Sequence, residues 1–242
     1  MKPAHYSVEH YADVDVAEGF DALRFGGPIG ELVAEEEARI ITAFVGDVTG
    51  AAVLDVGTGT ARAALALAGR GARVTGLDYS REMLRVGQAR VARGTAPVGL
   101  LRGDARHLPF ADRRFDVTVS VRLLMHMPDW RGTLAELCRV TRRRLVIDYP
   151  AKVSAAAIQS AARRVLHSTE PYRVFGDGAI DAVCRAAGFR VRDRHRHFVL
   201  PIALHKTVSA RGFTRASEGA LRALGVTGLV GSPVTLVAER EP

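Results

Sequence analysis

The feature that most constrains the fold is a regular alternation of strand-like and helix-like segments between residues 51 and 149. Apolar runs of strand length occupy residues 51–57, 72–79, 98–104, 115–121 and 143–149, and apolar residues at helical spacing mark the segments near 60–69, 81–93 and 130–140. Strands that alternate with helices over short connections form a mostly parallel sheet with helices on both faces. The sequence therefore predicts an α/β fold.

Further elements flank this core. Residues 1–46 place apolar residues at helical spacing, as in ELVAEEEARIITAFV, and predict an N-terminal helical cap. After Pro150 the pattern predicts helices at 153–167 and 179–188 and strands at 189–201 and 231–240. Residues 202–230 also have a helical pattern and are longer than a hairpin connection requires, so we expect an ordered insertion that serves binding.

Composition limits the class of protein. With 242 residues, 48% of them hydrophobic and 25% charged, residues 1–242 fit a single α/β domain with a substantial core. We expect no transmembrane segment, because no apolar run has the length that spans a bilayer, and a cytoplasmic location, because the N-terminus lacks a secretory pattern. Cys138 and Cys184 lie in apolar helical patterns, which predicts buried free thiols.

The net charge of +8 is concentrated near the C-terminus, since residues 185–222 hold nine Arg and Lys but two acids. A basic excess fits nucleic acid, anionic lipid, an acidic substrate or a solvated arginine-rich surface, and the aromatic residues that bind single strands by stacking are sparse here. His195 and His197 alternate with Arg194 and Arg196. A metal site there needs more ligands than the sequence reveals, so we expect no metal and an edge strand protected by charge.

A glycine turn follows the first predicted strand in VLDVGTGTAR, residues 53–62. A strand, tight turn and helix in this order direct backbone amides at a ligand. A dinucleotide fingerprint needs Gly or Ala at the place that Arg62 occupies. Asp55 before the turn suits a ligand with an amino group or sulfonium better than a pyrophosphate. Dinucleotide binding is therefore the weaker interpretation.

Acidic residues also end the next two strands. Asp78 lies twenty-one residues after Gly57, where a carboxylate can accept hydrogen bonds from two ribose hydroxyls. Its alternative role is the N-cap of the helix that follows it. Asp104 ends the third strand, in a position to accept from an exocyclic amine. Acids at three successive strand ends predict one continuous nucleoside-binding edge.

Four segments, VLDVGTGTAR, VTGLDYSREML, RGDARHLPFADRRFDVTVS and LMHMPD, resemble the class I S-adenosylmethionine-dependent methyltransferases. The resemblance covers about residues 50–150, and the pattern is similar to the branch that contains ubiquinone and menaquinone methyltransferases and many small-molecule methyltransferases. It implies a Rossmann-like sheet of seven mostly parallel strands whose last strand is antiparallel. It also implies a cofactor-binding core at 50–150 and S-adenosylmethionine as the cofactor.

The resemblance assigns roles to individual residues. It places the methionine moiety against the backbone of Gly57, Thr58 and Gly59 beside Asp55, and the ribose at Asp78. The remaining implied contacts are Tyr79 and Met83 flanking adenine, Asp104 and Ala105 at its edge, Ser120 or Val121 near the methyl donor, and Tyr6, Tyr11, Arg24 and Phe25 from the cap, with Arg24 on the methionine carboxylate. Arg24 is alternatively a solvated helix arginine.

The chain also departs from the family pattern. Ala61 stands where many relatives have Gly, which is a mild change at a helix start. The Pro-Gly turn usual before the fifth strand is absent, and RVTRRRLVIDYP stands in its place. The departures affect the transfer of a particular quinone substrate and leave the cofactor prediction unchanged.

Methyl transfer from a sulfonium is an in-line displacement, so alignment and desolvation supply much of the catalysis. A general base is needed only when the nucleophile carries a proton of unsuitable pKa. His126, just past the fourth strand, is the first candidate, and its alternative is an ordinary loop histidine. Tyr149, which ends the fifth strand, is the second candidate.

The sequence thus predicts methylation of a small or lipid-like acceptor. One alternative is an RNA methyltransferase or nucleic-acid-binding protein that uses the basic segment, and another is a noncatalytic cofactor-binding module. We expect residues 202–230 to cover the acceptor, with Ile202, Leu204, Phe213, Leu221 and Leu224 facing an apolar substrate and His205, Lys206, Arg211 and Arg215 facing an acidic head group. The alternative is that these apolar residues pack against the N-terminal cap.

Overall fold

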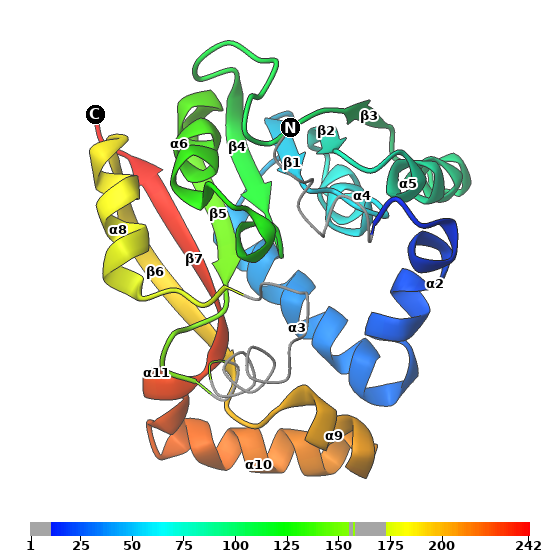
Figure 1. The fold of residues 1–242 in the computed structure, drawn as a ribbon, viewed down its shortest axis with the longest axis vertical. Helices are drawn as coiled ribbons and strands as arrows, with labels where there is room; N and C mark the ends of the chain where they lie inside the picture. Colours follow the sequence, from blue (N-terminus) through cyan, green and yellow to red (C-terminus); the bar gives the residue numbers. More distant parts are fainter. Residues whose placement is uncertain (1–10, 155–156, 158–172) are drawn as a thin grey trace.

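The computed structural model describes residues 11–154, 157 and 173–242. In these residues seven strands form one sheet in the order β3-β2-β1-β4-β5-β7-β6 (Figure 1). The strands are β1 (Ala52–Val56), β2 (Arg73–Asp78), β3 (Val98–Arg102), β4 (Phe115–Ser120), β5 (Thr141–Tyr149), β6 (Phe189–Phe198) and β7 (Ser232–Arg240). β7 runs antiparallel to β5 and β6, and the other neighbouring pairs are parallel. The predicted α/β class and the antiparallel last strand are confirmed.

The chain changes direction across the sheet at β1. From β1 it continues outward through β2 to β3, and then it crosses back to β4 on the other side of β1. Asp55 of β1 is in register with Gly76 of β2 and with Val119 of β4, so the carboxyl ends of these strands meet at one edge. Ligands of open α/β sheets bind at such a switch point.

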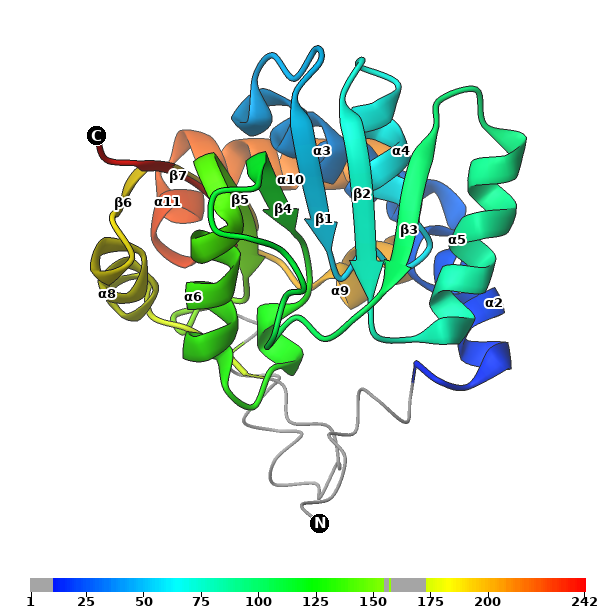
Figure 2. The same ribbon diagram turned by 90° about the horizontal axis from the view of Figure 1, so that it is seen from above.

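Helices cover both faces of the sheet, as Figures 1 and 2 show. One face carries α3 (Gly27–Val45), α4 (Arg62–Ala68) and α5 (Arg81–Arg93), and the other carries α6 (Trp130–Val140) and α8 (Asp177–Ala186). Strand residues alternate between two cores because side chains of a strand point to opposite faces in turn. In β5, Val146 packs in the α3 core, whereas Leu145, Ile147 and Tyr149 pack in the α6 core.

Polar side chains define where the helices begin. α2 (Val14–Phe25) starts after Asp13, which accepts from the Asp15 and Val16 amides. α5 starts after Ser80, whose Oγ accepts from the Met83 amide at 3.0 Å. Each cap satisfies backbone donors that a helix leaves unpaired in its first turn.

Three helices occupy the segment between β6 and β7, namely α9 (Ile202–Val208), α10 (Arg211–Ala223) and α11 (Val226–Val230). They lie beyond the carboxyl end of β6 in Figure 1, and α9 and α10 pack against α3. The buried Glu218 accepts from the amides of Val199 and Leu200, each at 2.9 Å, and from His205 Nε2 at 3.0 Å. Glu218 of α10 thus fixes the chain where it leaves β6.

Two predictions fall wholly or largely outside the described residues, the role of Tyr6 and the helix at 153–167. In the part of the chain that the structure describes, no helix combines the length and apolarity needed to cross a bilayer. Cys138 and Cys184 are buried free thiols, as predicted.

Candidate active site

A cavity of about 1500 Å³ opens at the carboxyl ends of the parallel strands. Its walls come from α2 and α3, from the loops after β1 to β5, and from the chain that joins β6 to α9. Of the predicted site residues, those that line it are Tyr11, Arg24, Asp55, Gly57, Thr58, Gly59, Asp78, Tyr79, Met83, Asp104, Ala105, Val121 and His126. The fold therefore brings most of the predicted site into one space.

The glycine turn presents bare backbone to this cavity. Gly57 and Gly59 have φ of 75° and 53°, in the left-handed region that glycine adopts readily. A Cβ at Gly57 would lie 3.3 Å from Leu123 Cδ1, and one at Gly59 would lie 3.2 Å from Met83 Cε. Both the conformation and the close neighbours therefore select glycine at these two positions.

Asp55 lies under the turn and is buried. Its carboxylate accepts a hydrogen bond from Thr58 Oγ1 at 2.7 Å. Burial raises the pKa of Asp55 to about 6, and the Thr58 bond opposes this shift. A cationic group of a ligand would stabilise the charged form of this carboxylate.

Asp78 joins the turn to the end of β2. Its two oxygens accept from the Gly59 amide at 2.8 Å and from the Ser80 amide at 2.9 Å. The N-cap of α5 is Ser80, so Asp78 is not that cap. A carboxylate has about four acceptor sites, which leaves capacity for ribose hydroxyls. Burial raises the pKa of Asp78.

Asp104 also lines the cavity but already has a cationic partner. Its carboxylate receives Arg106 Nε and Nη2 at 3.0 and 2.7 Å, and this pairing lowers the pKa of Asp104. Tyr79 is half exposed, and the Arg102 guanidinium lies 5.7 Å from its ring centre. An amine at Asp104 would share the carboxylate with Arg106.

Among the described residues predicted to contact the cofactor or act in catalysis, Phe25, Ser120 and Tyr149 do not line the cavity. The buried Ser120 donates its Oγ to the Val56 carbonyl at 2.9 Å. Tyr149 is fully buried in the α6 core, where its hydroxyl donates to Asp177 at 2.9 Å. Their strand neighbours Val121 and Asp148 line the cavity instead. The reason is the strand period of two, which turns adjacent side chains to opposite faces.

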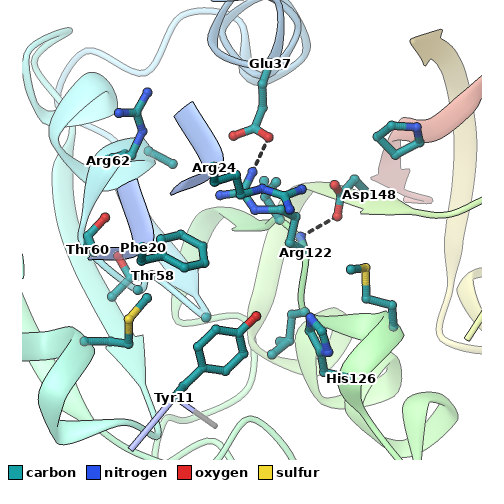
Figure 3. A pocket seen from close by; sticks show the side chains of 18 of the residues that line it. Tyr11, Phe20, Arg24, Glu37, Thr58, Thr60, Arg62, Arg122, His126 and Asp148 are labelled. Carbon is teal, nitrogen blue, oxygen red and sulfur yellow. Dashed lines mark hydrogen bonds and ion pairs between the residues drawn. The ribbon is translucent and has the colours of Figure 1, made fainter. Parts of the chain in front are cut away.

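The cavity wall between β4 and β5 holds a group of charged residues that the sequence analysis did not single out (Figure 3). Arg122 has a φ of 59°, its amide donates to Asp148 Oδ1, and its guanidinium pairs with Glu37 of α3. The ring of Phe25 has Arg122 5.1 Å from its centre and Arg62 4.1 Å away. Glu37 lies 85 residues from Arg122 in the chain, so local patterns carry no signal for the pair.

Arg24 faces the same space and lies beside Arg122 in Figure 3. Among the described residues the ion pair here joins Arg122 to Glu37, and no acid lies within 4.0 Å of the Arg24 guanidinium. Removal of the Arg24 guanidinium from water and, to a smaller extent, the positive charge of Arg122 lower the pKa of Arg24. An anionic ligand group would compensate this charge.

Tyr11 and His126 meet across the cavity. Their rings are edge to face with centres 5.8 Å apart. Ser80 Oγ donates to the Tyr11 carbonyl, which ties the start of the described chain to α5. The N-terminal segment therefore forms part of the wall at the place where His126 projects (Figure 3).

The side of the cavity away from the glycine turn is largely apolar. Its lining includes Met125, Met127, Phe198, Val199, Leu200, Ile202 and Pro233. Of the residues predicted to cover the acceptor, Ile202 and Lys206 line the cavity, whereas Leu204, Phe213 and Leu224 are exposed outside it. His205 is hydrogen-bonded to Glu218 and Arg211 pairs with Glu35, so these two side chains have partners within the protein.

One cluster has the side chains of a metal site. Glu36, His195 and His197 each offer a ligand atom within 4.8 Å of the others. Glu36 bonds to His195 Nε2 at 3.1 Å and to Arg39, and His197 Nε2 lies 2.8 Å from Thr235 Oγ1. Burial lowers the pKa of His197 to about 4. Hydrogen bonds within the protein therefore account for all three groups. Sequence analysis missed Glu36, which lies 159 residues from His195.

Three of the four arginines of β6 are paired with acids. Arg192 bonds to Glu239 at 3.0 Å, Arg194 pairs with Asp181, and Arg196 bonds to Asp177 at 2.6 Å. These ion pairs compensate much of the positive charge that the sequence concentrates in this strand. They favour a charged edge strand over a nucleic-acid surface.

Comparison with known proteins places this geometry among its relatives. Residues 53–144 match the family model described as "Methyltransferase domain". The demethylmenaquinone methyltransferase of Thermobifida fusca (strain YX) is 47% identical over 138 residues, 54% of this chain and 56% of that protein. O-methyltransferase cnsE of Penicillium expansum is 33% identical over 174 residues, 67% of this chain and 60% of that protein. The chain spans about half the length of the curated relatives it matches.

Solved structures share the fold. The magnesium protoporphyrin IX methyltransferase (ChlM) of Synechocystis PCC 6803 with bound SAH has a TM-score of 0.69 at 16% identity, over 98% of this chain and all of that one. The [4+2]-cyclase SpnF has a TM-score of 0.61 at 22% identity, over 86% of this chain and 80% of that one. At these identities the likeness shows the fold alone, and the two proteins are named for different reactions.

Proposed function

Because this chain belongs to the class I S-adenosylmethionine-dependent methyltransferases, we propose that it transfers the methyl group of S-adenosylmethionine to a quinone-like small molecule. One observation carries the proposal: a single cavity joins the glycine turn and the acids at the strand ends to an apolar wall. A polar nucleotide-type cofactor and an apolar acceptor can therefore meet in one enclosed space.

The residues at the strand ends fit this cofactor. Gly57 and Gly59 leave bare backbone for the methionine moiety, and a side chain at either position would take up that space. Asp78 accepts from the ribose hydroxyls, and Asp104 and Ala105 meet the adenine edge. Arg24 pairs with the methionine carboxylate, which supplies the anionic partner that its guanidinium lacks among the described residues.

The cofactor supplies a methyl group activated by the sulfonium. This chain binds and orients the two reactants and excludes water, which are the main contributions that an in-line displacement needs. Val121 lines the cavity next to the end of β4, where we place the methyl group. His126 is the candidate from the sequence for moving a proton on the acceptor.

The acceptor half supports a quinone-like ring with an apolar substituent, as in the relatives named demethylmenaquinone methyltransferase. We propose that α9 to α11 cover this half. Replacing residues 203–225 by a short Gly-Ser turn should preserve cofactor affinity and abolish turnover. A folded truncated protein with full activity on its acceptor contradicts the cover.

Calorimetry with S-adenosylmethionine and a transfer assay with methyl-labelled cofactor test the proposal together. A short-chain demethylmenaquinone should be offered as quinone and as quinol, and a cell extract should be searched by mass spectrometry for labelled products. Tighter binding of a nicotinamide dinucleotide than of S-adenosylmethionine contradicts the cofactor assignment. Cofactor binding without transfer to any acceptor supports the noncatalytic module instead.

The RNA methyltransferase alternative has less support, because three of the four arginines of β6 have acidic partners. Tight RNA binding that weakens steeply with salt would favour it. The cytoplasmic location expected from the sequence remains a prediction.

A further inference from the structure

Asp148 is a carboxylate of the cavity wall that no sequence motif singled out. It is the penultimate residue of β5, is 5% exposed and lines the cavity. Its neighbour Tyr149, the sequence candidate for catalysis, lies in the core on the opposite face of the sheet. At the end of β5, the residue that reaches the cavity is therefore Asp148 and not Tyr149.

A strained turn holds the Asp148 carboxylate. Arg122 adopts a φ of 59°, a backbone conformation that residues other than glycine rarely adopt. Its amide donates to Asp148 Oδ1. Among the described residues, this amide is the one hydrogen-bond donor to the side-chain carboxylate of Asp148. A carboxylate has about four acceptor sites, so capacity remains for a ligand in the cavity.

Charged groups from three neighbouring segments act on the Asp148 carboxylate. Arg122 follows β4, Arg24 belongs to α2 and Glu37 belongs to α3, while Thr235 of β7 is its partner in the sheet. Glu37 pairs with Arg122, so the cation closest to Asp148 is largely compensated. Burial raises the pKa of Asp148 to about 6, with the charge of Arg122 opposing the shift. The group is ionised at neutral pH and basic enough to take up a proton.

The fold also places Asp148 beside the expected reacting centre. Ser120 of β4 is in register with Ile147 of β5, so the next residues, Val121 and Asp148, emerge side by side at the carboxyl edge. Both line the cavity. A substrate group that contacts the methyl donor at the end of β4 is therefore within the space that Asp148 faces.

Building on the proposed function, we propose that Asp148 is the proton acceptor of the reaction and that the acceptor molecule carries a phenol- or enol-type hydroxyl. The O–H bond of the acceptor breaks and its proton moves to the Asp148 carboxylate. The electron pair released on the acceptor forms the bond to the methyl carbon, and the carbon–sulfur bond breaks with its electron pair left on sulfur. The proton then leaves Asp148 for water when product departs.

His126 is the competing proton acceptor in the same cavity. It comes from the 3₁₀ helix η1 (Leu124–His126) and meets Tyr11 edge to face. Asp148 differs because it is fixed at a strand end by the Arg122 amide. The two candidates predict different pH profiles for their variants, so one experiment separates them.

The test compares Asp148→Asn, His126→Gln and the control Asp112→Asn in the full chain with labelled S-adenosylmethionine and the acceptor found in the transfer assay. The amide oxygen of Asp148→Asn can still accept from Arg122. We expect its kcat to fall about 100-fold or more, the usual contribution of a general base. Its cofactor affinity should stay near that of the unmodified protein, and the acidic limb of the kcat profile near pH 6 should disappear. Asp112 is exposed and pairs with Arg139, and neither residue lines the cavity. Asp112→Asn should therefore keep the kcat and the cofactor affinity of the unmodified protein.

An unchanged kcat and acidic limb in folded Asp148→Asn overturn the proposal, and so does an acidic limb that only His126→Gln removes. If Asp148→Asn does not fold, the unmodified protein still provides a test, because a kcat profile flat from pH 5 to 7 excludes a base of this kind. Failure of the unmodified protein to bind cofactor or transfer methyl refutes the proposed function itself. These outcomes are distinct.

Discussion

The cavity has two sides, the glycine-turn side that we propose for the cofactor and the side with Met125 and Phe198 that we propose for the acceptor, and they are built in different ways. On the cofactor side, Asp55, Asp78 and Asp104 lie within two residues of the ends of β1, β2 and β3, which follow one another in the sequence. On the acceptor side, cavity-lining groups come from segments far apart, such as Arg122 after β4 with Glu37 of α3. The cofactor side repeats one arrangement, an acid at the end of a parallel strand. The acceptor side depends on how the helices pack against the sheet.

This difference predicts where mutations act. Changes at the cofactor side should alter cofactor affinity with little effect on the acceptor side. Changes at the acceptor side should alter stability or turnover and leave cofactor affinity near its original value. Four predictions test this separation, beginning with the largest expected effect.

Glu218→Ala should lower the free energy of unfolding by about 3–5 kcal/mol, because it leaves the half-buried amides of Val199 and Leu200 and the buried ring of His205 without their acceptor. Urea unfolding measures the loss. Glu218→Gln keeps one acceptor oxygen and should lose less. Cofactor affinity of the folded fraction should be unchanged, and a tenfold loss of that affinity would show that the two sides are coupled.

Asp55 and His197 should give the two sides opposite dependences on pH. The pKa of Asp55 is raised to about 6, so the folded state binds more protons than the unfolded state and the Asp55 contribution falls as pH rises from about 4 to 6. The pKa of His197 is lowered to about 4, so the unfolded state binds more protons and its contribution rises from about pH 4 to 6.5. Each effect amounts to about 3 kcal/mol.

Urea unfolding at pH 4.5 and pH 7 checks these signs. Relative to the unmodified protein, Asp55→Asn should become more stable as pH rises, and His197→Gln should become less stable. Equal pH dependence of both variants and the unmodified protein would show that neither group has a shifted pKa.

Asp78→Ala should weaken S-adenosylmethionine binding by about 1–3 kcal/mol, because the ribose loses its hydrogen-bond acceptor and the Gly59 amide loses its bond to Asp78. Asp78→Asn keeps one acceptor oxygen and separates the two effects. If the hydrogen bond from the Gly59 amide matters most, Asp78→Asn should retain most of the affinity. Calorimetry measures both variants. Unchanged affinity in folded Asp78→Ala rejects Asp78 as a cofactor residue.

Arg192→Gln should change the free energy of unfolding by at most about 0.5 kcal/mol, because its bond to Glu239 is solvent-exposed. Neither cofactor affinity nor turnover should change. If this strand bound RNA, the same substitution would reduce the salt dependence of binding by about one ion. Binding assays at several salt concentrations decide between these outcomes.

The sequence by itself determined the family, the α/β class and the position of nearly every described strand and helix. Period-two and helical patterns, the glycine turn and the capping residues are local, so they can be identified without knowledge of the packing. Boundaries were less accurate: β5 begins at Thr141 rather than at 143, and β6 ends at Phe198 rather than at 201. The predicted cofactor residues remain predictions, although all the described ones except Phe25 and Ser120 line the cavity.

Only the tertiary structure decided which side chains face the acceptor. The choice of Asp148 over Tyr149, and of Val121 over Ser120, depends on which face of the sheet each strand end presents to the cavity. In β5 the sequence already indicated which residues share a face, because Tyr149 follows the core residues Leu145 and Ile147 at steps of two. The pairs of Glu37 with Arg122 and Glu36 with His195 had no such signal, because helix α3 meets these strands only after the chain has folded.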